Sequence, residues 1–435
     1  MEIPGTNWVL NSGGEVWRRW RRAFGWGLAV VGLGWGQGLW AAEAAEAAGA
    51  AGAGRVDRAR LAAAIERGVT WLLQQQNSNG WWSTSEQPAV TAMVLTALNR
   101  EPTGRFLQSR PSELNQAYDF LLSSVRPDGS IYRVGLANYN TALSLLALST
   151  ANDPNFLPVI RNARAYLAGT QVDFGEPGVL DTPFDGGVGY GSKYQHSDMN
   201  NTLVAIEAMR WSEAALPRDV ASGQRLESDL NWEAVVHFLQ NCQNRKESNP
   251  AEWVSDSKED RGGFVYYPGH SMAGGVTNTV TGRVALRSYG SISYAGLLSF
   301  MYAKLERDDP RVTAVLEWLE GNYTLDENPG MGQQGLYYYL HLMTKALTAA
   351  RVGTLRVSGE AGPDTTSGAA GGGGRAVAWR DDVARRLLDL QRPDGSWVNE
   401  NPRWWETDPV LVTAYMVLTL EMLHADLAGD GNQRI

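Results

Sequence analysis

The chain reads Gln76-Asn77-Ser78-Asn79-Gly80-Trp81-Trp82 near its start and Gln391-Arg392-Pro393-Asp394-Gly395-Ser396-Trp397 near its end, and both stretches fit Gln-x3-Gly-x-Trp. Each follows an apolar segment with helical periodicity, and a second such segment begins about ten residues later. A motif that recurs between the same two kinds of helix indicates an internal repeat. The Gln can hydrogen-bond open carbonyls at the preceding helix end, the Gly permits a positive φ, and the Trp can cover the helix junction.

Weaker copies of the unit fill the interval between the two motifs. Each copy begins with an apolar helix that carries polar residues on one face, predicted over 65–75, 117–124, 163–171, 235–243, 315–323 and 383–391. A Gly-rich turn follows, and then a helix that is apolar on all sides, over 91–98, 141–148, 202–209, 294–303, 335–347 and 412–423. Helices of the second kind must be enclosed by others. Six hairpins therefore predict an all-α fold, an (α/α)6 toroid over residues 60–425.

The Gln-x3-Gly-x-Trp motif and the helices rich in Thr, Ala and Leu, such as 91–98 and 141–148, resemble the prenyltransferase and squalene-cyclase repeat superfamily. The chain is similar to its bacterial members with a single α/α toroid. The resemblance implies a terpenoid-cyclase or protein-prenyltransferase-like barrel that binds an isoprenoid or similar apolar ligand in its central cavity. It also implies a terpene cyclase or mutase-like activity.

Composition supports one large globular domain with no surface for nucleic acid. Hydrophobic residues make up 43% of the 435 residues and charged residues 20%, which is ample for a large core. The net charge of −9 gives no basic footprint for nucleic acid. The single cysteine, Cys242, cannot form an intramolecular disulfide.

The N-terminus has the order of an export signal. Arg18-Arg19-Trp20-Arg21-Arg22 precedes an uncharged run over 23–42, and Ala42-Glu43-Ala44 supplies a small-residue cleavage pattern. Residues 1–44 are therefore predicted to direct export to the periplasm or cell envelope by the Sec or twin-arginine route, although the run could also remain as a membrane anchor. A flexible leader over 45–59, a disordered loop over 359–375 and a tail over 426–435 complete the predicted organisation.

Functional residues are expected where the inner helices begin, because these amino ends point to one mouth of a toroid. Asp198-Met199-Asn200-Asn201-Thr202 precedes the third inner helix. It resembles the Asp-x-Asp-Asp-Thr of protonating triterpene cyclases, in which the middle Asp protonates an alkene. Asn200 stands at that position here and has no acidic proton to give. Asp198 is therefore the candidate acid, with Asn200 and Asn201 beside it, although Asp198 could also be only a helix cap.

Ligand-binding residues are expected at the same helix ends, because aromatic faces stabilise cations and pack on branched isoprenoid chains. The candidates are Tyr139, Tyr294, Gln334, Tyr337, Tyr338 and Asp408. Zinc prenyltransferases carry Asp-x-Cys before an inner helix, whereas the equivalent segment here is Ser291-Ile292-Ser293. Neither a metal nor a cofactor is therefore expected.

Two hypotheses remain open from the sequence. In the first, the protein is an isoprenoid cyclase or isomerase that uses Asp198 as a non-standard acid. In the second, it is a non-catalytic toroid that binds a lipid, or a scaffold for a glycan, peptide or protein. A functional Asp198 buried among aromatic residues should have a raised pKa, whereas a simple cap that accepts hydrogen bonds from amides should have a lowered one.

Overall fold

The computed structural model describes residues 56–191, 195–216, 228–357 and 375–427. The predicted export signal and most of the leader lie outside the described residues. So do the predicted C-terminal tail beyond residue 427 and the Gly-rich tract over 358–374.

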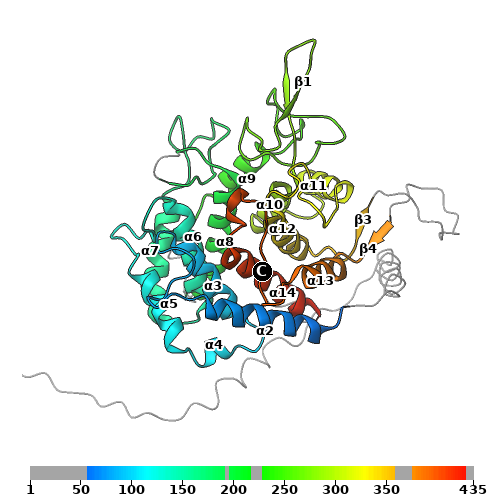
Figure 1. Cartoon of the computed structure of the whole chain (residues 1–435). Coiled ribbons are helices and arrows are strands. Elements are labelled where there is room, and N and C mark those ends of the chain that lie inside the picture. Colours follow the sequence, from blue (N-terminus) through cyan, green and yellow to red (C-terminus); the bar gives the residue numbers. More distant parts are fainter. Residues whose placement is uncertain (1–55, 192–194, 217–227, 358–374, 428–435) are drawn as a thin grey trace, which may run out of the picture. The chain divides into compact units, whose positions relative to one another are not determined.

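The described chain forms six helical hairpins arranged in a ring (Figure 1). The outer helices are α2 (Arg58–Gln74), α5 (Ser112–Leu122), α7 (Leu157–Ala168), α9 (Trp232–Gln240), α11 (Pro310–Gly321) and α13 (Trp379–Leu390). The inner helices are α3 (Pro88–Arg100), α6 (Ala137–Thr150), α8 (Met199–Ala215), α10 (Gly290–Tyr302), α12 (Leu336–Ala349) and α14 (Pro409–Leu427). Each inner helix packs against the next, and α14 packs against α3 to close the ring. The predicted (α/α)6 toroid is confirmed.

The inner and outer helices differ in burial as their residue patterns predict. Outer helix α2 buries a single stripe of residues and leaves the rest to solvent. Inner helix α14 is long and apolar enough to cross a membrane, but 83% of its most apolar window is buried inside the ring. Its uniform apolarity follows from enclosure by its neighbours.

The Gln of the repeat motif joins neighbouring outer helices. Gln76 donates through Nε2 to the carbonyl of Gly80 at 3.1 Å and to that of Glu113, in the next outer helix, at 2.8 Å. The prediction that it caps its own preceding helix is wrong. The motif tryptophan does this instead, because the indole Nε1 of fully buried Trp82 donates to the Leu72 carbonyl of α2 at 2.7 Å. An indole reaches back over a helix end while filling the core, which a Gln side chain cannot do.

The glycine of the motif allows two backbones to touch where the ring closes. Gly395 has a φ of +96°, and a Cβ there would lie 2.6 Å from the Arg67 carbonyl oxygen of α2. Any side chain would therefore clash as well as strain the backbone. Gln391 completes the closure by donating to the Ala64 carbonyl at 2.9 Å. The last repeat thus bonds to the first as the first bonds to the second through Gln76.

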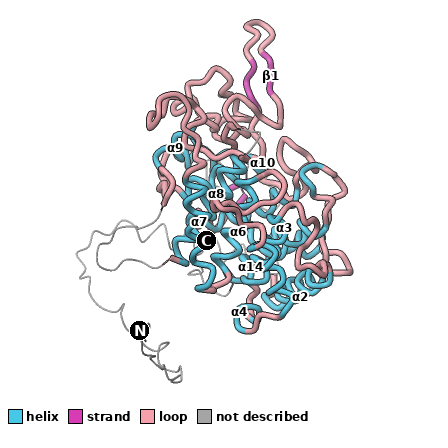
Figure 2. Tube along the Cα trace, turned by 90° about the vertical axis from the view of Figure 1, so that its left-hand side faces the viewer, coloured by secondary structure: helices cyan, strands magenta, loops and turns pink. Residues whose placement is uncertain are grey.

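Several short elements interrupt the helical plan. Helix α4 (Arg105–Gln108) and the 3-10 turns η2 (Pro154–Phe156) and η3 (Arg403–Trp405) lie in connections between helices. Strands β1 (Gly275–Thr277) and β2 (Val284–Leu286) pair antiparallel, as do β3 (Leu355–Val357) and β4 (Arg375–Val377). The β1–β2 hairpin projects beyond the helices (Figure 2).

Candidate functional site

A cavity of about 220 Å³ lies at the amino ends of the inner helices. Each of the six contributes from its first turn or two, among them Val90 of α3, Tyr139 of α6, Asn200 of α8 and Tyr338 of α12. The cavity thus lies at one mouth of the ring, which is where the sequence predicted the functional site.

The wall of this cavity, called here the aromatic cavity, is aromatic and uncharged. Eight of its seventeen lining residues carry aromatic rings: Tyr139, Tyr190, Tyr266, Tyr289, Tyr338, Trp404, Trp405 and Tyr415. The rest are aliphatic, sulfur-containing or neutral polar residues, and none is ionised at neutral pH. Such a wall suits an apolar ligand and presents ring faces to any positive charge on it.

Tyrosine hydroxyls are held in fixed directions around the cavity. Tyr338 donates its hydroxyl hydrogen to Oδ1 of Asn200 at 3.2 Å, and its ring centroid lies 5.7 Å from that of Tyr415. Tyr415 in turn packs on His341, with centroids 5.2 Å apart. Burial lowers the pKa of His341 well below its ordinary value, so its ring is neutral.

Asp198 lies behind the wall rather than in it. It is fully buried and caps α8, with Oδ1 accepting from the Asn201 backbone N–H at 3.0 Å and Oδ2 from the Asn201 side-chain amide at 2.7 Å. Burial raises the pKa of Asp198 to about 6, although the hydrogen bonds from Asn201 and Tyr266 oppose the shift. Asp198 is therefore both a helix cap and a group with a raised pKa, which the sequence analysis treated as alternatives. The two coincide because a cap inside a barrel loses more hydration than its hydrogen bonds restore.

Two tyrosines connect Asp198 to the aromatic cavity. Tyr266 interacts with the Asp198 carboxyl and opposes the rise of its pKa, and the Tyr266 hydroxyl lies 3.1 Å from the Tyr190 hydroxyl. Both tyrosines line the cavity. The carboxyl is thus one side chain removed from the cavity.

The structure separates the predicted ligand-binding residues. Tyr139 and Tyr338 line the aromatic cavity, whereas Tyr294, Gln334, Tyr337 and Asp408 do not. Tyr294 is buried in the helix packing, with its ring 5.6 Å from that of Tyr339. Its placement in the wall is therefore corrected, because position 294 of α10 faces an adjoining helix and not the lumen.

The other three residues that do not line the cavity make structural contacts in the loops and helix caps beside it. Tyr337 is buried next to Glu406, whose carboxylate accepts from its backbone N–H at 3.3 Å. The Gln334 carbonyl accepts from Asn328 at 3.0 Å. Asp408 caps α14 by accepting from the Val410 N–H at 2.9 Å. Helix-end position alone could not distinguish these structural roles from lumen contacts.

Two consecutive tryptophans lie in the wall, and the sequence reasoning missed Trp405. Trp404 and Trp405 have φ values of 55° and 65°, in the left-handed region that bulky residues avoid. Gly335 makes room for the first, since a Cβ there would lie 2.6 Å from the Trp404 ring. Strained backbone of this kind clusters at ligand sites. The Trp-Trp pair itself was the available sequence signal.

Comparisons with known proteins concern the fold. A scan against models of protein families finds no match, and a search of curated proteins finds none. Among solved structures, the type II terpene cyclase MstE from Scytonema is similar at 15% identity and a TM-score of 0.47, covering 84% of this chain and 98% of that one. The GH76 α-mannanase BT2949 of Bacteroides thetaiotaomicron is similar at 9% identity and a TM-score of 0.47, covering 86% and 98%. At such identities the likeness is one of fold alone.

Proposed function

We propose that this toroid binds a small, branched apolar molecule, an isoprenoid or the end of an isoprenoid chain, in the aromatic cavity. The observation that carries the proposal is the wall itself, which combines eight aromatic side chains with no ionised group. Burial of apolar ligand surface against such a wall supplies the affinity, and the ring faces accommodate the methyl branches of an isoprenoid.

Cavity size restricts the ligand. A volume of about 220 Å³ is below the roughly 300–1,000 Å³ of pockets that enclose drug-sized molecules. The cavity therefore suits one or two isoprenoid units, with the remainder of a longer chain leaving through the mouth beside Trp405, whose side chain is 52% exposed.

Binding without catalysis is the reading that the geometry favours over proton-initiated cyclisation. None of the described residues that line the cavity carries a carboxyl group, and Asn200 presents an amide where an alkene-protonating acid would have to stand. An alkene is a very weak base, so its protonation requires an acid in direct contact with it.

The second candidate function, isomerisation of an isoprenoid, is favoured by one observation. Burial raises the pKa of Asp198 to about 6, and the carboxyl interacts with Tyr266, which does reach the cavity. An isomerisation would move a proton from Asp198 to one ligand carbon and return the proton lost from the neighbouring carbon to the carboxylate. It therefore requires the carboxyl to reach the ligand past Tyr266, whose raised pKa makes its own hydroxyl too weak an acid for the step.

Binding can be tested by titrating the purified protein with geraniol and with n-decanol, its unbranched counterpart of equal carbon number, following tryptophan fluorescence from the wall. We expect saturable quenching that is stronger for geraniol. Met93→Trp, which fills the cavity, should abolish it, while Tyr294→Phe, in the core away from the cavity, should leave it unchanged. Equal quenching in Met93→Trp, or tighter binding of an oligosaccharide than of geraniol, would reject the proposal.

Catalysis can be tested separately by incubating geraniol with the wild type and with Asp198→Asn, and analysing products by gas chromatography. Products formed by the wild type and absent with Asp198→Asn would establish the isomerase. Binding without any product would leave the carrier function alone.

Export remains a proposal that rests on residues 1–44 alone. We expect N-terminal sequencing of the native protein to begin near Ala45, after the Ala42-Glu43-Ala44 pattern. Recovery of the intact leader in the cytosol would reject export, and recovery in the membrane fraction would favour an uncleaved anchor.

A further inference from the structure

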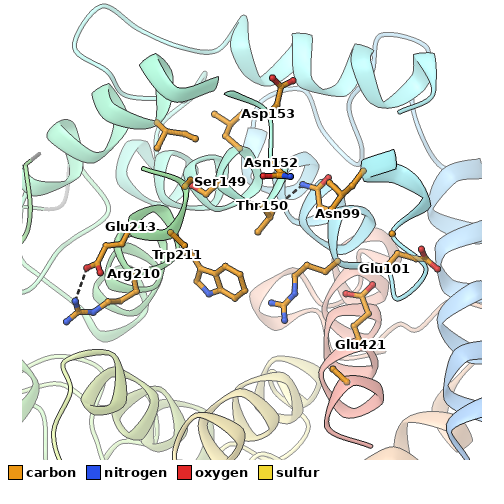
Figure 3. A pocket seen from close by; sticks show the side chains of 18 of the residues that line it. Asn99, Glu101, Ser149, Thr150, Asn152, Asp153, Arg210, Trp211, Glu213 and Glu421 are labelled. Atoms are coloured by element: carbon orange, nitrogen blue, oxygen red, sulfur yellow. Dashed lines mark hydrogen bonds and ion pairs between the residues drawn. The ribbon is translucent and has the colours of Figure 1, made fainter. Parts of the chain in front are cut away.

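A second cavity occupies the opposite end of the ring. It has a volume of about 1090 Å³ and is lined by the carboxyl ends of α3, α6, α8, α10 and α14. Figure 3 shows Trp211, Glu421 and Asn99 around its opening. It shares no lining residue with the aromatic cavity, so its chemistry can be considered separately.

Glu421 on α14 is a buried carboxyl group without a partner in this second cavity. Its side chain is 4% exposed, and within the described part of the chain neither carboxyl oxygen accepts or donates a hydrogen bond. Burial raises the pKa of Glu421 well above its ordinary value. Nearly all buried polar groups in proteins are hydrogen-bonded, so an orphaned carboxyl group is evidence of a missing partner.

Arg100 on α3 is a half-buried cation in the same wall and is also unpaired. Its guanidinium lies 4.9 Å from the centroid of the Trp211 ring, and it makes no hydrogen bond or ion pair to any described residue. It acts on Glu421 electrostatically, lowering that group's pKa against the effect of burial, yet the two form no ion pair. The cavity thus holds an unsatisfied cation and an unsatisfied acid that face the same space.

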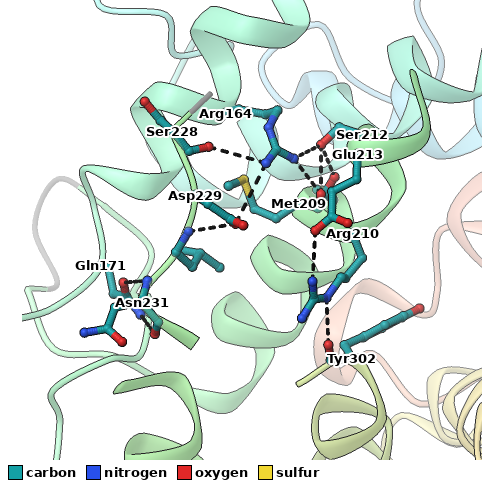
Figure 4. Close-up of polar contacts among 12 residues, drawn as sticks. Arg164, Gln171, Met209, Arg210, Ser212, Glu213, Ser228, Asp229, Asn231 and Tyr302 are labelled. Atoms are coloured by element: carbon teal, nitrogen blue, oxygen red, sulfur yellow. Dashed lines mark hydrogen bonds and ion pairs between the residues drawn. The ribbon is translucent and has the colours of Figure 1, made fainter. Parts of the chain in front are cut away.

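The other charged residues of this wall are already paired or are exposed to water. Arg210 donates to Glu213 at 2.9 Å and to the Tyr302 carbonyl at 2.7 Å (Figure 4). Arg58 donates to His424 at 3.0 Å. The two unsatisfied groups are therefore a specific feature of the cavity and not a general property of its charged residues.

We propose that this second cavity binds a small zwitterion that carries an ammonium and a carboxylate, of the amino-acid type, with the ammonium donating to Glu421 and the carboxylate accepting from Arg100. When Glu421 is ionised, such a ligand satisfies both groups, whereas an anion would leave Glu421 unpaired and a cation would leave Arg100 unpaired. The carboxyl ends of five helices also turn their negative dipole ends toward this cavity, which favours the ammonium.

Isothermal titration with matched ligands near neutral pH tests the proposal. L-Leucine, arginine and glutamate represent zwitterions, 4-methylpentanoate and 3-methylbutylamine are leucine without its ammonium or its carboxylate, and xylitol represents uncharged polar molecules. We expect at least one amino acid to bind, and the single-charge analogues to bind at least about tenfold more weakly, because each forfeits one charged hydrogen bond.

Variants identify the residues responsible. Glu421→Gln and Arg100→Gln should each weaken amino-acid binding by about ten- to a hundredfold. Glu213→Gln, in the same wall but paired with Arg210, should change it by less than about twofold. Quenching by geraniol should be unaffected in Glu421→Gln, which shows that the variant is folded and separates this site from the aromatic cavity.

Three results would overturn the proposal. The first is that no amino acid binds at millimolar concentration. The second is that xylitol or a single-charge analogue binds as tightly as the amino acid. The third is that folded Glu421→Gln binds the amino acid as the wild type does.

Discussion

Replacing Asp198 with Asn should change how the stability of the protein depends on pH. Burial raises the pKa of Asp198 from 3.8 to about 6 in the native state, whereas the unfolded chain exposes it to water. The native state therefore holds this proton more tightly than the unfolded state does. The stabilisation that results is complete below the unfolded pKa and is lost as pH rises through the native one.

The size of the effect follows from the shift. At about 1.4 kcal/mol for each pKa unit, ionisation of Asp198 removes about 3 kcal/mol from the free energy of unfolding between acid and alkaline pH. Asp198→Asn cannot ionise and keeps an oxygen to cap α8. Oδ1 of Asn201 has no partner among the described residues, so after an amide flip it can accept from the new amide. The variant should retain its fold.

Urea unfolding of both proteins at about pH 5 and about pH 8 measures the difference. Between these two pH values, the free energy of unfolding of Asp198→Asn should rise by about 1.5 kcal/mol relative to that of the wild type, which is roughly half of the 3 kcal/mol. The contributions of all other titrating groups to the pH dependence cancel in this comparison, because both proteins contain those groups. A control is Asp309→Asn at the cap of α11, whose native pKa is lowered. Its relative stability should hardly change over this range. Parallel curves for Asp198→Asn and the wild type would refute the raised pKa.

Three further predictions concern glycine, the barrel interior and the second cavity. Gly395→Ala should cost more than about 2 kcal/mol in urea unfolding, because its Cβ meets a backbone carbonyl of α2 at positive φ. Gly321→Ala, where a Cβ meets nothing within 4 Å, should be neutral or stabilising. Lys345→Met should cost about 3–5 kcal/mol, because it leaves the carboxylate of Glu207, 2.5 Å away, buried without its cation. The double variant with Glu207→Leu should regain most of that loss, and failure to do so would show that packing, not charge, is responsible. At pH values above neutral, Glu421→Gln should raise the melting temperature. This gain should shrink on acidification, because the raised pKa of Glu421 means that only its ionised form destabilises the native state. A gain independent of pH would contradict this origin.

The repeat motif could be found in the sequence because the same residue types recur at the same spacing after a helix. Trp82 bonds back to the helix that it follows, and Gly80 supplies the positive φ of the turn, although a Cβ at Gly80 would also meet the Gln116 carbonyl of the next outer helix. The role of the Gln was assigned incorrectly, because Gln76 bonds to a carbonyl of the next outer helix. A partner in another repeat leaves no mark on local spacing.

The cavity wall was only partly predictable, for a geometric reason. Successive residues of a helix point about 100° apart, so the run from Tyr337 to Tyr339 must face different neighbours. The sequence shows that some tyrosine reaches the lumen, but the rotation of α12 within the ring selects Tyr338. The same rotation on α10 directs Tyr294 into the helix packing.

The sequence by itself determined the six hairpins, the apolar inner ring and the cap that Asp198 forms on α8, since each depends on residues close together in the chain. The tertiary structure alone decided that Asp198 is desolvated beside Tyr266, and that Arg100 and Glu421 face one cavity with no ion-pair partner among the described residues. These properties arise between helices that are distant in sequence. Solvation and charge at such places depend on which side chains the closed ring brings together.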